Sequence, residues 1–258
     1  MKRTVVLTFL IMIAVNAAAN IIPIGGKNTG QVSDSYPNLF APAGLTFSIW
    51  GLIYILLAGY TVYQLGYFQK GKTVIRERLL TKVGVLFSIS SVANAIWIFS
   101  WHYEILPASM MLMIVILACL ILINQILREE DLSAAEKVFV RLPFSVYFGW
   151  ITVATIANAT TLLVSTGFDG WGLSEATWAV IMISAGAVIG IATMLKNRDI
   201  AYGLVIVWAY AGIIIKHTSA AGFNGRYPQV ITAAGLCIAL FVIAGAYIVK
   251  RRRKIRNS

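Results

Sequence analysis

The chain has 258 residues, of which 59% are hydrophobic and 12% are charged, and its formal net charge is +11. Soluble globular domains carry about 25% charged residues, so this composition excludes that class and indicates an integral membrane protein. A basic soluble domain would favour nucleic acid as a partner, but here membrane topology explains the charge. We therefore expect the lipid bilayer, and no nucleic acid, as the partner of this chain.

Eight apolar runs are long enough to cross a bilayer, since a helix needs about 20 apolar residues to span the hydrocarbon core. We expect a single all-α domain, a polytopic membrane helical bundle of about eight transmembrane helices. The predicted spans are residues 4–24, 44–66, 80–101, 106–127, 140–164, 176–195, 200–216 and 228–249.

The basic residues divide unevenly between the loops on the two sides of the membrane. If every run crosses, 18 of the 21 Lys and Arg residues fall on the side that holds both termini. Because cytoplasmic loops carry the excess of Lys and Arg, this division predicts a multi-pass protein of the inner (cell) membrane with both termini in the cytoplasm. The basic tail, residues 250–256, would also rest on anionic lipid.

The first span has a second interpretation. Residues 1–20 have the basic, apolar and small-residue regions of a secretory signal, with Ala17 and Ala19 as an A-x-A site. Cleavage there would leave seven spans and an external N-terminus. The apolar run continues through Ile24 to a spanning length, which favours a retained helix.

Two polar breaks are long enough to form structure of their own. The first outer loop, residues 25–44, is rich in turn-forming residues and is sized to cover a pocket mouth. Residues 128–141 carry mixed charges at helical spacing, so we expect them to prolong the fourth or fifth span into the cytoplasm. Cys119 and Cys237 fall inside spans, where we expect free, buried thiols.

Catalytic and metal motifs are missing from the sequence. All ten acidic residues lie in loops or at span ends, which argues against an ion-coupled pump. The only histidines, His102 and His217, are predicted at the outer surface, where ordinary interfacial residues are the first interpretation and a shared metal or haem iron the second. We predict no catalytic site, no metal site and no enzymatic activity.

Four of the predicted spans carry aromatic or amide side chains along one face. In the second span, the small residues Gly44, Ser48 and Gly51 run beside this face and would let another helix approach closely. The faces comprise Asn16 and Asn20; Phe47, Trp50, Tyr54 and Leu57; Ser90, Asn94, Trp97 and Trp101; and Tyr147, Trp150, Ala154 and Asn158.

The alternating direction of the spans places five of these residues at one depth, in the outer half of the membrane: Asn20, Trp50, Asn94, Trp97 and Asn158. Aromatic faces and amides at one depth suit a flat hydrophobic ligand with a few polar edges. A purely structural role is the alternative, because tryptophans gather at membrane interfaces and asparagines can join helices. We expect Trp101, Tyr103, Trp171 and Trp178 to be interfacial residues of this kind.

Three of these faces carry motifs that resemble the tryptophan-rich sensory protein family, also called the translocator protein or peripheral benzodiazepine receptor (TspO/MBR) family. The family has paired prolines before W-x-x-x-Y in its second helix, L-N-x-x-W in its third, and Trp followed eight residues later by Asn in its fifth. One proline of the pair is replaced by Ala41, and the Trp that follows the pair is missing near Gly44. The matching residues are Pro42, Trp50 and Tyr54; Asn94 and Trp97; and Trp150 and Asn158.

The resemblance implies a five-helix core over residues 1–165 and three additional helices with a basic tail over residues 166–258. It implies a porphyrin or haem as the hydrophobic ligand, a sensory or transport role, and, because family members are often dimers, it allows a homodimer. By resemblance the ligand-binding residues are Trp50, Tyr54, Asn94, Trp97, Trp150 and Asn158.

Two other functions remain open at this point. One is a facilitative transporter of a small amphipathic solute, for which a break near Gly203, Gly212 or Lys216 in the seventh span would be the sign. The other is an enzyme that acts on a lipid-soluble substrate such as a polyene or a tetrapyrrole, for which the sequence offers no evident acid, base or metal.

Overall fold

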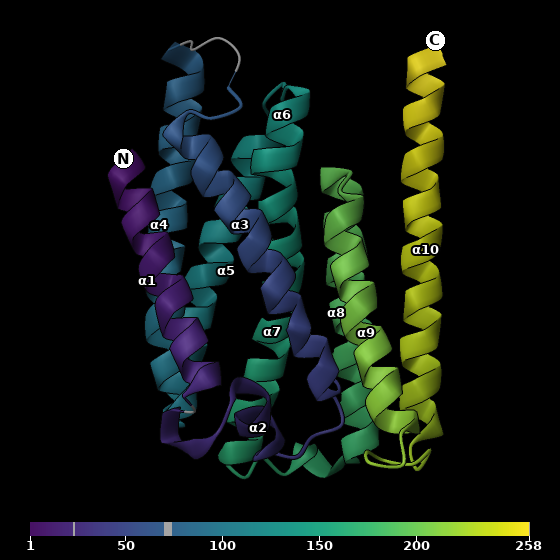
Figure 1. Cartoon of the computed structure of the whole chain (residues 1–258). Helices are drawn as coiled ribbons and strands as arrows, with labels where there is room; N and C mark the ends of the chain where they lie inside the picture. The colour runs from purple at the N-terminus through teal and green to yellow at the C-terminus, as the bar shows by residue number, and fades with distance from the viewer. Residues whose placement is uncertain (23, 70–73, 258) are drawn as a thin grey trace.

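The computed structural model describes residues 1–22, 24–69 and 74–257 and is an all-α bundle (Figure 1). Its described residues contain eight helices that are long and apolar enough to cross a membrane, as the sequence predicts. The long helices are α1 (Lys2–Ile21), α3 (Ile49–Leu65), α4 (Val74–His102), α5 (Leu106–Arg128), α7 (Leu142–Ser165), α8 (Glu175–Asn197), α9 (Ile200–Thr218) and α10 (Pro228–Asn257). The short elements are η1 (Ile24–Gly26), α2 (Thr29–Asp34), η2 (Gly44–Ser48), α6 (Ala134–Glu136), η3 (Lys137–Arg141) and η4 (Gly170–Gly172).

The helices form a ring of five and a group of three. In the ring, α1 packs on α4, α4 on α5, α5 on α7, α7 on α3, and α3 back on α1. In the group of three, α8, α9 and α10 all contact one another, and α9 packs on α7 of the ring (Figure 1). Helix α7 therefore connects the two parts.

Both termini lie at the same end of the bundle, and α2 lies at the opposite end (Figure 1). An even number of crossings produces this arrangement. It places the basic tail and residues 128–141 at one end, and the loop that contains α2 at the other.

Local sequence explains where several helices begin and end. The side chains of Ser174 and Asp199 cap the first turns of α8 and α9. Pro143 stands in the first turn of α7, where a missing N–H costs nothing, and Gly66 ends α3 in the left-handed conformation that glycine tolerates.

The segment over residues 128–141 extends the fifth span, one of the two possibilities that its charge pattern predicted. Here α6 leads into η3, a π-helical turn, and η3 continues into α7. The carboxylate of Glu136 is buried in this segment and forms an ion pair with Arg76 of α4. Separating the partners of a buried ion pair leaves an uncompensated buried charge, so this pair ties α4 to the segment that leads into α7.

Helix α9 has no break within its described length, contrary to the condition set for a transporter. Gly203 and Gly212 instead lie at close contacts, the first against the Met194 side chain of α8 and the second against Thr46 of η2. These two glycines let neighbouring elements approach α9 closely.

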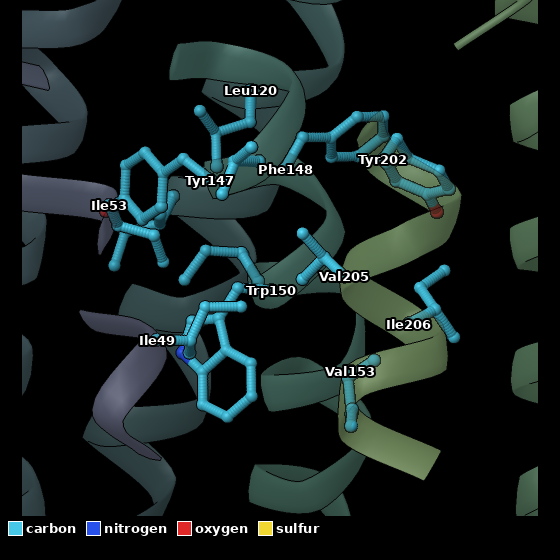
Figure 2. Packing of buried hydrophobic residues seen from close by; sticks show 14 of the residues in the cluster. Ile49, Ile53, Leu120, Tyr147, Phe148, Trp150, Val153, Tyr202, Val205 and Ile206 are labelled. Atoms are coloured by element: carbon cyan, nitrogen blue, oxygen red, sulfur yellow. The ribbon is translucent and has the colours of Figure 1, made fainter. Parts of the chain in front are cut away.

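Helix α7 carries buried side chains on two opposite faces (Figure 2). Tyr147 and Trp150 point toward α3, whereas Phe148 points toward α9, where its ring lies 4.8 Å from that of Tyr202. Gly149 faces α9, and a Cβ atom there would come within 2.7 Å of the Tyr202 carbonyl oxygen. The absence of a side chain at Gly149 thus brings α9 against the back of the helix that carries Trp150.

Candidate functional site

Trp50 stands at the centre of an aromatic cluster in the half of the ring near α2. Its ring stacks on Tyr54 of the same helix at 5.5 Å between centroids. It lies 6.3 Å from Trp97 of α4 and 6.0 and 6.2 Å from Tyr147 and Trp150 of α7. These are the offset and edge-to-face distances that aromatic pairs prefer. Three helices that are distant in sequence are therefore joined through one indole.

A chain of amide hydrogen bonds runs behind this cluster. Asn16 of α1 donates to the side-chain oxygen of Asn94 at 2.7 Å, and the Asn94 amide donates to the Tyr147 hydroxyl at 3.2 Å. All three side chains are buried, so each group needs its partner. The chain fixes α1, α4 and α7 relative to one another, and Asn94 acts within it rather than on a cavity wall.

On one side of Trp50 lies a small cavity of about 40 Å³. Asn158 lines it and donates to the Ser109 hydroxyl of α5 at 2.7 Å, while its side-chain oxygen is buried and unpaired. Trp97 and Trp150 also line this cavity, and their indole nitrogens are buried without a protein partner. Three buried polar atoms without partners are uncommon in a folded protein and mark a place for water or for a polar group of a ligand.

On the other side of Trp50 lies a larger cavity of about 470 Å³, bounded by α1, α2, η2 and α3. Trp50 and Tyr54 form its aromatic wall, and Asn16, Asn20 and Gln31 contribute amides. Trp50 and Phe47 line both cavities and separate them.

The small residues of the second span have a different role from the one the sequence predicted. An added Cβ atom at Gly44 or Gly51 would meet nothing within 4 Å, so no helix packs closely on this strip. Gly44 and Ser48 instead line the larger cavity. Their small size leaves the space open.

Residues 25–44, which we call the lid, cover this end of the bundle as predicted for the first outer loop. The Trp101 indole of α4 donates to the Thr29 carbonyl oxygen of the lid at 3.1 Å. Trp101 is only 4% exposed, so the prediction that it is an interfacial residue is wrong. Its ring stacks on Trp97 at 5.8 Å and extends the aromatic cluster to the lid.

A second attachment of the lid is electrostatic. Lys27 and Tyr36 both bond to the carboxylate of Glu104, in the turn between α4 and α5, at 2.7 Å each. The Lys27 hydrogen bond, followed by that of Tyr36, holds the pKa of Glu104 below its ordinary value. The same bond to Glu104 raises the pKa of Tyr36.

Helix α9 holds the lid and η2 from the opposite side. The backbone N–H of Ala43 donates to the Gly212 carbonyl oxygen at 3.0 Å. The Trp208 indole N–H donates to the Thr46 carbonyl oxygen, also at 3.0 Å. Lys216 forms an ion pair with Asp34 of α2 at 2.7 Å. Helix α9, one of the additional helices, thus positions η2, which leads into the first turn of α3 and Trp50.

Both histidines lie at the end of the bundle that carries the lid, but neither ring is exposed as an interfacial histidine would be. His217 is 0% exposed and His102 is 4% exposed. A ring nitrogen of His217 lies 2.9 Å from the Leu39 carbonyl oxygen, and a ring nitrogen of His102 lies 2.8 Å from the Ile98 carbonyl oxygen. Among the described residues, no group of three or more His, Cys, Asp and Glu side chains could hold a metal ion.

The six residues assigned to the ligand by resemblance all lie in or directly behind this cluster. Trp50 and Tyr54 line the larger cavity, Trp97, Trp150 and Asn158 line the smaller one with Trp50, and Asn94 lies behind them. The set omitted several residues that complete the site, although helical spacing already placed most of them on the same faces. They are Asn16, Asn20, Phe47, Trp101 and Tyr147.

The fold and the site together define a polytopic helical membrane protein with an aromatic and amide-lined cavity in one half of its thickness. Comparison with protein families gives the more particular assignment. Residues 2–247 match the family described as TSPO-like protein, and the chain belongs to that family. The match confirms the resemblance seen in the tryptophan and asparagine motifs, and it continues through α8, α9 and most of α10. Searches of curated proteins and of solved structures gave no significant match.

Proposed function

We propose that this protein binds a flat hydrophobic ligand of the tetrapyrrole class between the two cavities, as part of a sensory or transport function. Trp50 and Tyr54 would stack on the ligand face. Rotation of the Trp50 side chain would join the cavities and admit a polar edge of the ligand to Trp97, Trp150 and Asn158. A cytoplasmic location of both termini is part of the proposal, so the cavities would lie in the outer half of the inner membrane.

The unpaired polar atoms carry this proposal. The indole N–H groups of Trp97 and Trp150 are donors and the Asn158 oxygen is an acceptor, and all three are buried without a protein partner. A purely structural cluster would leave each of them at a cost of about 1–3 kcal/mol. The volume of the larger cavity, about 470 Å³, falls in the usual range for small-molecule sites.

The test is a titration of the purified full-length protein in nanodiscs with protoporphyrin IX, followed by the quenching of tryptophan fluorescence. We expect Trp50→Phe and Trp50→Ala to weaken binding by about three- to tenfold, because each loses indole stacking. Asn94→Ala should also weaken it, through release of Asn16 at the cavity wall. Trp171→Phe is the matched control, since Trp171 is 77% exposed and lines neither cavity.

Empty nanodiscs and a nanodisc with an unrelated membrane protein correct for partitioning and inner-filter effects. Saturable binding that is weakened at Trp50 and unchanged at Trp171 would support the site. Quenching equal to that of the unrelated protein would reject a tetrapyrrole ligand. Uptake into sealed proteoliposomes that contain only this protein would then distinguish a transporter from a sensor.

A further inference from the structure

A third cavity, of about 810 Å³, lies at the end of the bundle that holds both termini. It opens between two parts of the chain. One is η3 together with the start of α7, and the other is the turn that joins α8 to α9. We call it the basic cavity, because six cationic side chains line it. They are Arg128, Lys137, Arg141, Lys196, Arg198 and Arg252.

The one acidic residue in the lining is already bonded within the protein. Asp199 is 6% exposed, accepts a hydrogen bond from the Ser145 hydroxyl, and accepts another from the Tyr202 backbone N–H at 3.2 Å. These bonds cap α9 and join it to α7, and this single carboxylate is set against six cationic side chains in the lining. The cavity therefore keeps a large excess of positive charge.

Two of the four arginines in the lining are held by backbone carbonyl groups rather than by carboxylates. Arg141 donates to the Asn197 carbonyl oxygen at 2.6 Å, and Arg252 of α10 donates to the Arg198 carbonyl oxygen. Arg128 has an ion pair with Glu129 at 3.7 Å, but Glu129 is 75% exposed and such a pair is weak. The guanidinium groups of Arg141 and Arg252 are thus oriented without being neutralised.

Membrane topology alone does not account for this arrangement. The positive-inside rule places cations at one end of a bundle, but it does not gather them around a concavity from five separate elements. Elsewhere at the same end, Arg76 pairs with buried Glu136 and Lys2 donates to the Leu65 carbonyl oxygen. The basic cavity differs from these sites because its cations surround open volume.

We propose that the basic cavity binds a phosphate-bearing anion. Guanidinium groups bond phosphate oxygens in pairs, and ammonium groups such as those of Lys137 and Lys196 add charge at short range. Leu142, Ile200 and Ala201 supply an apolar floor, so the site meets both hydrocarbon and water. Basic cavities between transmembrane helices at this depth suit the headgroup of an anionic lipid, and a soluble phosphate compound carries the same recognised group.

Calorimetric titration of the full-length protein in a nonionic detergent tests this site with four probes. Dioctanoyl phosphatidylglycerol carries the lipid phosphate, dioctanoyl phosphatidylcholine is its zwitterionic control, and inorganic pyrophosphate and inorganic phosphate represent soluble anions. Binding of phosphatidylglycerol alone would identify a lipid headgroup as the source of the phosphate. Binding of pyrophosphate or phosphate with similar affinity would identify a soluble anion.

The variant Lys137→Gln/Lys196→Gln tests whether binding occurs in this cavity. Within the part of the chain that the structure describes, neither lysine side chain makes a hydrogen bond or an ion pair, and both residues are exposed, so we expect the double variant to fold. We expect binding of whichever anion is recognised to weaken by about thirtyfold, since each of the two cations contributes about 1 kcal/mol near the surface. Lys82→Gln/Lys250→Gln removes the same charge from exposed positions outside the cavity and should bind as the unaltered protein does.

Either of two results would overturn the proposal. One is no saturable binding of phosphatidylglycerol, pyrophosphate or phosphate. The other is an equal loss of binding in both double variants, which would show that total charge and not this cavity attracts the anion.

Discussion

Glu104 connects two parts of the chain that are separated by about seventy residues. Its carboxylate bonds to Lys27 and Tyr36 of the lid, and it sits in the short turn between α4 and α5 with a positive φ of 56°. Both Lys27 and Glu104 are more than a third exposed, so solvent screens the pair and its contribution to stability is modest.

The lowered pKa of Glu104 makes this contribution depend on pH. A carboxyl group whose pKa is lower in the folded protein than in the unfolded chain stabilises the fold when the pH is above its unfolded-state pKa, about 4.3 for Glu. This stabilisation is lost as the pH falls through the pKa of the folded protein. We expect Glu104→Gln to lower the thermal unfolding temperature at pH 7, and the difference from the unaltered protein to disappear in acid. A difference that stays constant from pH 7 to pH 3 would contradict this assignment.

Helical spacing could predict much of the site at the level of single residues. Trp50 and Tyr54, Asn94 and Trp97, and Trp150 and Asn158 lie on the expected faces, and a common depth brings them together. Spacing placed Trp101 on the face of Asn94 and Trp97, but the general preference of tryptophan for membrane interfaces led to the opposite expectation, and its bond to the Thr29 carbonyl oxygen depends on where the lid lies. The pairing of Asn16 with Asn94 likewise depends on which helices are neighbours, which a single sequence does not state.

The contact between η2 and α9 positions Trp50 most directly, because η2 leads straight into the first turn of α3, where Trp50 lies. Gly212 lies against the side chain of Thr46, which is itself buried, and one backbone hydrogen bond joins Ala43, the residue before η2, to the Gly212 carbonyl oxygen. The sequence marked Gly212 as a candidate break in the seventh span. It is instead the point at which an intact helix admits a close neighbour, a distinction that requires knowledge of what packs there.

Substitution of Gly212 tests this contact. In Gly212→Ala the new Cβ atom would overlap the Thr46 hydroxyl and lie within 2.9 Å of Thr46 Cβ, so η2 must move. We expect the free energy of unfolding to fall by about 1–3 kcal/mol, the usual cost of overpacking, together with a change in tryptophan fluorescence. Reversible unfolding in mixed detergent measures the first and an emission spectrum the second.

Gly235→Ala on α10 is the matched control, because its Cβ atom would meet nothing within 4 Å. Adding Thr46→Ala to Gly212→Ala removes the overlapping hydroxyl and should recover part of the loss. Equal stability of the Gly212 and Gly235 variants would show that η2 is not held against α9 in the way described.

The molecule as a whole presents two chemically different ends. The end with the termini carries the basic tail and the basic cavity, and the other carries the lid, the buried histidines and most of the site. Hydropathy alone predicted the eight spans, because each must cover the same bilayer thickness. It could not predict that the ring closes through α1 and α3, since the order of helices in space depends on packing.

Labelling of introduced cysteines tests the orientation of the bundle. Cys119 and Cys237 are buried, so they should react little with a membrane-impermeant maleimide. In intact spheroplasts we expect Ala220→Cys, in the loop after α9, to be labelled, and Glu129→Cys, in the loop after α5, to be labelled only after permeabilisation. The opposite pattern would place the termini outside and the aromatic cavities in the inner half.

The attachment of the lid to α9 also sets the order in which the site can be completed during synthesis. Residues 1–165 leave the ribosome before Gly212, Lys216 and His217 have been made, so the five-helix ring can insert while its lid still lacks those three anchors. The turn that carries Trp50 reaches its final position only when α9 arrives. A nascent or truncated chain would therefore span the membrane with an unfinished candidate site.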